Sequence, residues 1–269
     1  PNTRGVVQWN GTAWQTVGNG VNGTVNTLVA SDSLLFVGGQ FSMAGATMCK
    51  NLAWWNGSVW GQPASYIDGE VKSIAYRNNY LYVASANLDT FKVRRLNVKM
   101  PSPAWELLMQ GNIADVVLQL AVTDSVVYVC GRDLQNINQD KNIKNIARYN
   151  LFPKSTGWYP VAPKGNDGYV NSISVGDRKL FVGGSFNNNN GQPMKNAAKW
   201  NTYFWEPLSN PHELMGEVFS VCANGNETFF AGEFTNPTGA KNIAKWNGLQ
   251  WDNLSGGLQY PVSVVAANG

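Results

Sequence analysis

Five copies of the N-glycosylation tripeptide Asn-x-Ser/Thr contain the residues whose chemistry follows most directly from the sequence. The tripeptide marks an exposed loop of a secreted protein that can accept a glycan, and Asn236-Pro-Thr is excluded by its proline. Asn-Gly also favours a hairpin turn without any sequon, as at Asn247, so the turn alone is an alternative explanation. The glycosylation candidates are Asn10, Asn22, Asn56, Asn226 and Asn253.

A Lys-Asn pair recurs four times at the start of an apolar run and gives a second set of candidates. Four lysines at one repeat position would form a positive ring for an anionic ligand, whereas a turn-capping Asn beside a solvated Lys is the structural alternative. The run 187–190 would suit hydrogen bonds to sugars or to a protein, with a solvated linker as its alternative. The binding-face candidates are Lys50, Lys144, Lys195, Lys241, Asn187, Asn188, Asn189 and Asn190.

The other reactive side chains form no catalytic pattern. The chain has one histidine, His212, and three cysteines without a Cys-x-x-Cys motif, which excludes histidine-rich metal sites and predicts buried free thiols. A glycosidase needs two carboxylates about 5–9 Å apart, and the scattered Asp and Glu residues do not establish such a pair. An enzyme with a carboxylate pair in a central channel of the fold is therefore only a third alternative. We therefore predict that the protein is not an enzyme and has no catalytic residues, metal site or cofactor.

Composition and charge indicate a turn-rich, aromatic-rich, all-β protein. Only 14% of the 269 residues are charged. The chain contains 28 Gly, 11 Trp, 10 Tyr and 11 Phe. The net charge of +3 is spread without a basic block, which argues against a nucleic-acid partner. No run of 18 apolar residues occurs, so we expect no membrane insertion by this segment. Because the chain begins with Pro1, we expect a processed or partial polypeptide.

The elements that position these residues belong to one unit that recurs along the whole chain. Each unit has a Val-x-x-(Leu/Ile/Val) run (a), a run such as LFVGG (b), a run such as NIAKWN (c) and a Trp-bearing run (d). Four antiparallel strands in about 45 residues are typical of a β-propeller blade. We expect the aromatic pairs of c and d, such as Trp9 and Trp14, to pack between blades, and Asn-Gly to form type I′ turns between them. The opening valines are Val25, Val71, Val117, Val170, Val218 and Val262.

The number of units predicts a single propeller domain over 1–269, with six blades, or seven if more repeats lie outside this sequence. The complete blades are expected at 25–69, 70–115, 116–168, 169–216 and 217–260. Residues 1–24 would supply strands c and d of the closing blade, and 261–269 its strand a. Its b strand is missing, and a gap one strand wide, about 5 Å, does not stay empty. We expect the chain to continue beyond one or both ends, with a strand donated by a neighbour as the alternative.

The repeat resembles two groups of propellers. Apolar-Gly-Gly followed by an aromatic and a later Trp is similar to the kelch repeat. The motifs GGQF…NLAWWNGSVW and AGEF…NIAKWNGLQW more closely resemble the Trp-Asn-Gly repeats of secreted and cell-surface propellers, which include fungal cortical polarity-marker proteins. The likeness covers the whole chain, although the unit at 70–115 lacks Gly-Gly and has Leu96 for Trp. It extends to galactose-oxidase-like copper enzymes, whose two-His, two-Tyr site cannot be assembled with His212 alone.

The resemblance and the candidate residues together predict an extracellular or cell-surface protein. We expect a non-catalytic scaffold or interaction propeller, such as a structural component of a coat, a matrix or a filamentous appendage. Its partners would be other extracellular proteins or copies of itself, with glycans as a further class. The alternative is a lectin-like propeller that binds carbohydrate with the b–c loop face, since variable loops on a rigid scaffold commonly form binding surfaces.

Overall fold

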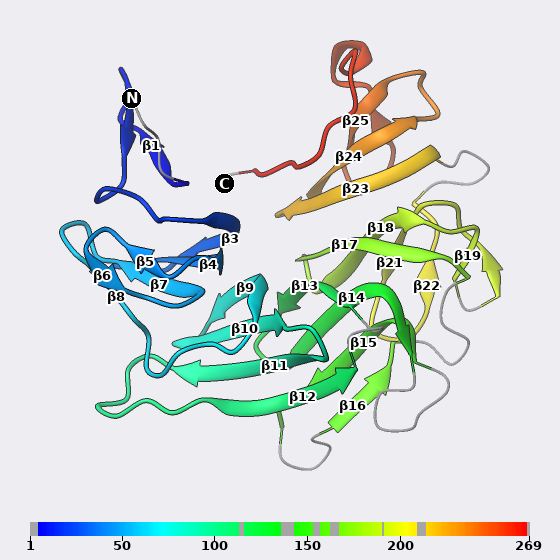
Figure 1. Ribbon diagram of the computed structural model, residues 1–269. Helices are drawn as coiled ribbons and strands as arrows, with labels where there is room; N and C mark the ends of the chain where they lie inside the picture. Colours follow the sequence, from blue (N-terminus) through cyan, green and yellow to red (C-terminus); the bar gives the residue numbers. More distant parts are fainter. Residues whose placement is uncertain are drawn as a thin grey trace. The chain divides into compact units, whose positions relative to one another are not determined.

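The computed structural model describes residues 5–112, 116–135, 143–152, 157–161, 167–189, 191–208 and 214–267. Over these residues the chain is all-β, apart from one 3-10 turn, η3 (Leu254–Gly256). Five four-stranded antiparallel sheets form, each from strands that follow one another along the chain (Figure 1). The contacts divide the chain into two compact units, 1–120 and 121–269, which are described separately.

The first unit contains two of the four-stranded sheets and two short hairpins. Its first hairpin is made of β1 (Val7–Trp9) and β2 (Trp14–Thr16). The next sheet is β3 (Thr24–Ala30), β4 (Leu35–Gln40), β7 (Leu52–Trp55) and β8 (Trp60–Gly61), with the hairpin β5 (Met43–Ala44) and β6 (Thr47–Met48) inserted between β4 and β7. The following sheet is β9 (Glu70–Arg77), β10 (Tyr80–Ala86), β11 (Thr90–Asn97) and β12 (Glu106–Asn112).

The second unit continues the same pattern, and its boundary falls within β13 (Val116–Val122). That strand pairs in a sheet with β14 (Val126–Gln135), β15 (Lys144–Asn150) and β16 (Gly157–Pro160). The next sheet is β17 (Tyr169–Gly176), β18 (Lys179–Ser185), β21 (Ala197–Trp200) and β22 (Trp205–Glu206), with the hairpin β19 (Asn188–Asn189) and β20 (Gln192–Pro193). The last is β23 (Met215–Asn224), β24 (Glu227–Thr235), β25 (Lys241–Trp246) and β26 (Trp251–Asp252).

These sheets confirm the all-β, four-stranded antiparallel organisation predicted from the repeat, while the number of blades, their limits and the closure stay predictions. The segment predicted as the closing a strand, 261–269, forms no strand over its described residues 261–267. Two of its backbone amides are nevertheless bonded to the last sheet. Val262 N donates to Gly232 O at 3.0 Å, and Val265 N donates to Ser220 Oγ at 3.2 Å.

A hydroxyl group on one a strand accepts a hydrogen bond from the backbone of the next, and this contact repeats. The donor–acceptor pairs are Ile74 N with Thr27 Oγ1 at 3.3 Å, Leu120 N with Ser73 Oγ at 3.0 Å and Val221 N with Ser172 Oγ at 2.9 Å. The bond from Val265 N to Ser220 Oγ has the same place in the repeat. Because Ser73, Ser172 and Ser220 are buried, each hydroxyl provides a backbone amide with a partner inside the protein. Residue 265 therefore occupies the position of an a-strand residue.

Aromatic pairs join strands c and d, as expected. The ring centroids lie 5.3–5.6 Å apart in the pairs Trp9–Trp14, Trp55–Trp60, Tyr149–Trp158, Trp200–Trp205 and Trp246–Trp251. Trp60, Trp200 and Trp251 are buried in separate core clusters with residues of neighbouring sheets. The expectation of burial is wrong for the first pair, since Trp9 and Trp14 are 53% and 63% exposed. Their sheet has only two strands, and nothing in the described part of their own unit covers this face.

The c–d hairpins correct the predicted type I′ turn. Trp9 pairs with Trp14 and Trp55 with Trp60, so each loop has four residues rather than two. Only the glycine has a positive φ, 99° at Gly11 and 94° at Gly57. The Asn side chain makes the turn instead: Asn56 Oδ1 accepts bonds from the backbone N–H groups of residues 58 and 59, at 3.0 and 2.9 Å. Because Asn56 Oδ1 accepts these bonds, the turn forms without the positive φ that a type I′ turn would require of the Asn.

Candidate functional site

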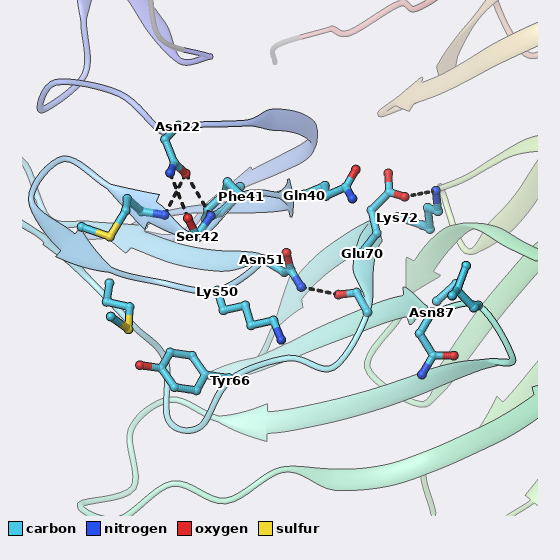
Figure 2. Close-up of a pocket in the computed structure, with 15 residues that line it drawn as sticks. Asn22, Gln40, Phe41, Ser42, Lys50, Asn51, Tyr66, Glu70, Lys72 and Asn87 are labelled. Carbon is cyan, nitrogen blue, oxygen red and sulfur yellow. Dashed lines mark hydrogen bonds and ion pairs between the residues drawn. The ribbon is translucent and has the colours of Figure 1, made fainter.

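The loops of the first two sheets border an open pocket of about 880 Å³ in the first unit (Figure 2). The volume lies in the range of small-molecule ligand sites. Its walls come from the loop before β3, the β5–β6 hairpin, the β8–β9 loop with the start of β9, and the end of β10. The residues that matter below are Asn22, Gln40, Met43, Met48, Lys50, Asn51, Tyr66, Glu70, Lys72, Asn87 and Leu88. Most of them belong to b–c or d–a loops.

Asn22 ties the loop before β3 to the b–c loop of the same sheet. Its Oδ1 accepts from the backbone N–H groups of Ser42 and Met43 at 2.9 and 2.8 Å, and its Nδ2 donates to Ser42 Oγ at 2.9 Å. Asp167 has the equivalent role in the second unit, where it accepts from the backbone N–H groups of Asn187 and Asn188 at 2.8 and 2.9 Å. Partial burial acts to raise the pKa of Asp167, but the Asn188 and Asn187 bonds outweigh it and lower that pKa. This shared role was missed from sequence, although an Asn or Asp three residues before the repeat Val is visible there.

The Lys-Asn pairs divide into a structural Asn and a surface Lys. Asn51, Asn145, Asn196 and Asn242 all have φ between 60° and 67°, a conformation that Asn tolerates better than most residues. Each donates its Nδ2 to a backbone oxygen of the following d–a loop: Gly69 O, Gly168 O, Leu214 O and Leu258 O, respectively. The asparagines therefore have the structural role that was the alternative to ligand binding: their side chains bond the backbone of the following loop. Of the four lysines, Lys50 is exposed and lines the pocket, Lys144 and Lys241 are exposed elsewhere, and Lys195 is half-buried.

An ion pair closes one side of the pocket. Lys72 Nζ lies 2.7 Å from Glu70 Oε2, and Asn26 Nδ2 donates to Glu70 Oε1 at 2.7 Å. The Lys72 hydrogen bond is the main cause that lowers the pKa of Glu70, against a smaller opposing effect of burial. The second unit repeats the Asn–Glu hydrogen bond, with Asn171 Nδ2 donating to Glu217 Oε1 at 2.7 Å. The two glutamates therefore hold the start of successive a strands together.

The sequon asparagines are all exposed, but they differ in how their amide nitrogens are used. At Asn10 and Asn56 only Oδ1 has a hydrogen bond to the described residues, in the hairpin turn, and at Asn253 Oδ1 accepts from Ser255 N. The acceptor nitrogen of Asn22 instead donates to Ser42 Oγ. In the sequon of Asn226, the hydroxyl residue Thr228 is only 1% exposed. The occupancy of these sites stays a prediction.

The polar run 187–190 lies partly in the β19–β20 hairpin, and Asn190 is outside the described residues. Asn187 is exposed and Asn188 half-buried, and both are held by Asp167. Asn189 is buried, and neither its Oδ1 nor its Nδ2 has a hydrogen-bond partner among the described atoms. Residues 187–189 are therefore held within their own loop, and they do not line the pocket of the first unit.

Three further observations concern chemistry and membranes. Within the described residues, Cys49, Cys130 and Cys222 form no disulfide bond; Cys49 and Cys130 are buried as predicted, while Cys222 is half-buried. Burial raises the pKa of Cys49. Within the described ranges, no three His, Cys, Asp or Glu side chains lie close enough together to hold a metal ion. In the same ranges, no helix is long and apolar enough to cross a bilayer. His212 lies outside the described residues.

Comparison with known proteins supports a β-propeller. A family profile described as "Rax2 C-terminal beta propeller domain" matches residues 8–127. Among solved structures, the computationally designed Ika8 protein aligns with a TM-score of 0.56 and 11% identity, covering 93% of this chain and 80% of that one. YCF48 bound to D1 peptide aligns with a TM-score of 0.53 and 14% identity, covering 94% and 78%. No curated protein matches. The likeness to kelch and galactose-oxidase propellers stays a prediction.

Proposed function

We propose that this chain is a non-catalytic interaction propeller that works outside the cell, as a structural component of a surface coat, a matrix or a filamentous appendage. One observation carries the proposal. The recurring polar residues, such as Asn51, Ser73 and Glu70, are used to hold neighbouring elements together, whereas the loops of the first unit leave a wide pocket open to solvent. A rigid repeat scaffold with an open loop pocket is suited to binding a partner.

The sequons support the extracellular part of the proposal. Asn10 and Asn56 lie at hairpin tips, are exposed, and keep their Nδ2 atoms without a hydrogen bond to the described residues. Their partner residues Thr12 and Ser58 are exposed as well. We expect these two sites to carry glycans first, because a hairpin tip is accessible and the turn needs only Oδ1.

Expression through a eukaryotic secretory pathway, with intact mass measured before and after N-deglycosylation, tests this location. Ser58→Ala removes one sequon and leaves Asn56 Oδ1 in its turn, so we expect the loss of one glycan step. Leu249→Ala changes the same position of the Asn247 turn, which has no sequon, and should lose none. A wild-type mass that deglycosylation does not change would contradict the extracellular assignment.

Carbohydrate binding is the second candidate, and the exposed ring of Tyr66 in the pocket favours it. Aromatic rings and side-chain amides commonly form the polar and apolar parts of ligand sites. A glycan array with purified protein tests this function. Hits that Tyr66→Ala abolishes would support it, and an array without hits would count against it.

A further inference from the structure

We infer that the pocket of the first unit binds an extended peptide segment in which an acidic group lies beside an apolar side chain. The inference rests on the proposed interaction function and names the class of ligand. Three observations carry it: the apolar wall, a pocket lysine that makes no ion pair with the described residues, and the commitment of the pocket amides to internal bonds.

The apolar wall is made of long, adaptable side chains that remain open to solvent. Met48 is 63% exposed, Tyr66 52% and Leu88 91%, and the partly buried Met43 lies on the β5–β6 hairpin with Met48. Thioethers adapt to different apolar partners, and Met residues are frequent at peptide-binding surfaces. Exposed side chains of this kind lose water favourably when an apolar group covers them. They therefore provide a place for an aliphatic or aromatic side chain of a ligand.

The charge of the pocket comes from Lys50. Two other charged side chains line it, Lys72 and Glu70, and these neutralise one another at 2.7 Å. Lys50 is exposed, extends into the space that Tyr66 and Asn87 border, and makes no ion pair with the described residues (Figure 2). One uncompensated ammonium next to an apolar wall is complementary to one carboxylate next to an apolar side chain. The carboxylate would belong to Asp, Glu or a chain terminus.

The amides of the pocket argue against a polyhydroxyl ligand. Asn22 uses both its Oδ1 and its Nδ2 on the b–c loop. Asn51 donates to Gly69 O, and Asn87 accepts from the backbone N–H groups of residues 89 and 90 while its Nδ2 donates to a neighbouring carboxylate. Sugar hydroxyls need several unused donors and acceptors. Among the side-chain amides that line the pocket, only that of Gln40 makes no hydrogen bond with the described residues, so few groups are left for a sugar. The same bonds fix the walls before any ligand arrives, which reduces the entropy cost of binding.

A displayed library of random twelve-residue peptides, panned against the purified full chain, provides the probes. We expect the enriched sequences to combine an apolar residue with a nearby Asp or Glu. The best sequence is then synthesised with a fluorophore, and its Kd is measured by fluorescence anisotropy. Lys50→Gln should weaken binding about tenfold, which is the effect of one charge-assisted hydrogen bond. Met48→Glu should weaken it further, because it places a like charge beside the carboxylate.

Lys241→Gln is the matched control, since Lys241 has the same repeat position in the last sheet and does not line the pocket. Its Kd should equal that of the wild type, and circular dichroism should show all variants folded. Peptides that bind with no dependence on Lys50 or Met48 would overturn the pocket assignment and leave the interaction function in place. Glycan-array hits lost in Tyr66→Ala would overturn the peptide in favour of a sugar. A chain that retains neither peptides nor glycans would contradict both proposals.

Discussion

Asn196 is the residue at which the role of the repeated Asn can be tested most sharply. It is 6% exposed and has a φ of 63°. Its Oδ1 accepts from Phe186 N at 3.1 Å, and its Nδ2 donates to Leu214 O at 2.9 Å. One side chain therefore joins the b–c loop of its own sheet to the loop that leads into the next. We predict that Asn196→Ala strongly destabilises the second unit.

The magnitude follows from three costs. Alanine leaves the amide of Phe186 and the carbonyl of Leu214 without their partner, and each unsatisfied buried group costs about 1–3 kcal/mol. Alanine in the left-handed region costs about 1–2 kcal/mol more. The sum is about 3–8 kcal/mol, a large part of the stability of an ordinary domain. Asn196→Gly loses the same two bonds but avoids the backbone strain, so we expect it to cost about 1 kcal/mol less than alanine.

Urea unfolding followed by tryptophan fluorescence measures both variants, since Trp200 and Trp205 are buried in the same sheet. The midpoint should fall while the dependence of the unfolding free energy on urea concentration stays the same. A loss below about 1 kcal/mol for alanine would refute the reasoning on the hydrogen bonds. A glycine variant less stable than the alanine variant would refute the reasoning on φ.

Three further predictions concern single repeat positions. Thr202 has a φ of 87° and occupies the hairpin position that Gly57 has in another sheet. Because glycine adopts a positive φ without strain, Thr202→Gly should raise the unfolding free energy by about 1 kcal/mol in thermal melts, and Gly57→Thr should lower it. Ser172→Ala leaves the Val221 amide unsatisfied, and urea unfolding should show a loss of about 1–3 kcal/mol; an unchanged midpoint would contradict the hydroxyl contact. Asp167 has a lowered pKa in the folded state, so its stabilisation is present above the unfolded pKa, about 4, and is lost as the pH falls through the folded value. Asp167→Asn should therefore have a smaller difference in melting temperature between pH 7 and pH 3 than the wild type. The same difference in variant and wild type would exclude the pH-dependent stabilisation by Asp167.

The sheets could be predicted from the sequence because the information is local and repeated. Val-x-x-Leu, the polar a–b turn and the Trp-bearing runs recur in each unit, and each copy specifies the same strand order. The turn between c and d could not be predicted in detail, because the side-chain acceptor of Asn56 replaces a backbone conformation. The C-terminal segment has the amide contact of an a strand at Val265 but no ladder, since a strand also requires a neighbouring strand to pair with.

The pocket was only partly accessible from the sequence. Lys50 was a candidate because its Lys-Asn pair repeats, and the b–c loops were expected to form a binding face. The sequence contains no signal for Tyr66, Met48 and Leu88, because they occur once, in loops, where no periodicity marks them. Their importance depends on the loops meeting in space. In contrast, the exposure of Trp9 shows that a repeat position predicts burial only where a neighbouring sheet is present.

Hydrogen–deuterium exchange of the whole chain, with and without the best library peptide, tests most directly whether this propeller binds a partner through the loops of its first unit. The account predicts slower exchange in the b–c loop over 40–51 and in the segment 66–72 when the peptide is bound. It predicts no change in the β19–β20 hairpin, which has the same place in the second unit's repeat. Protection confined to other segments, or no protection at a saturating peptide concentration, would contradict it.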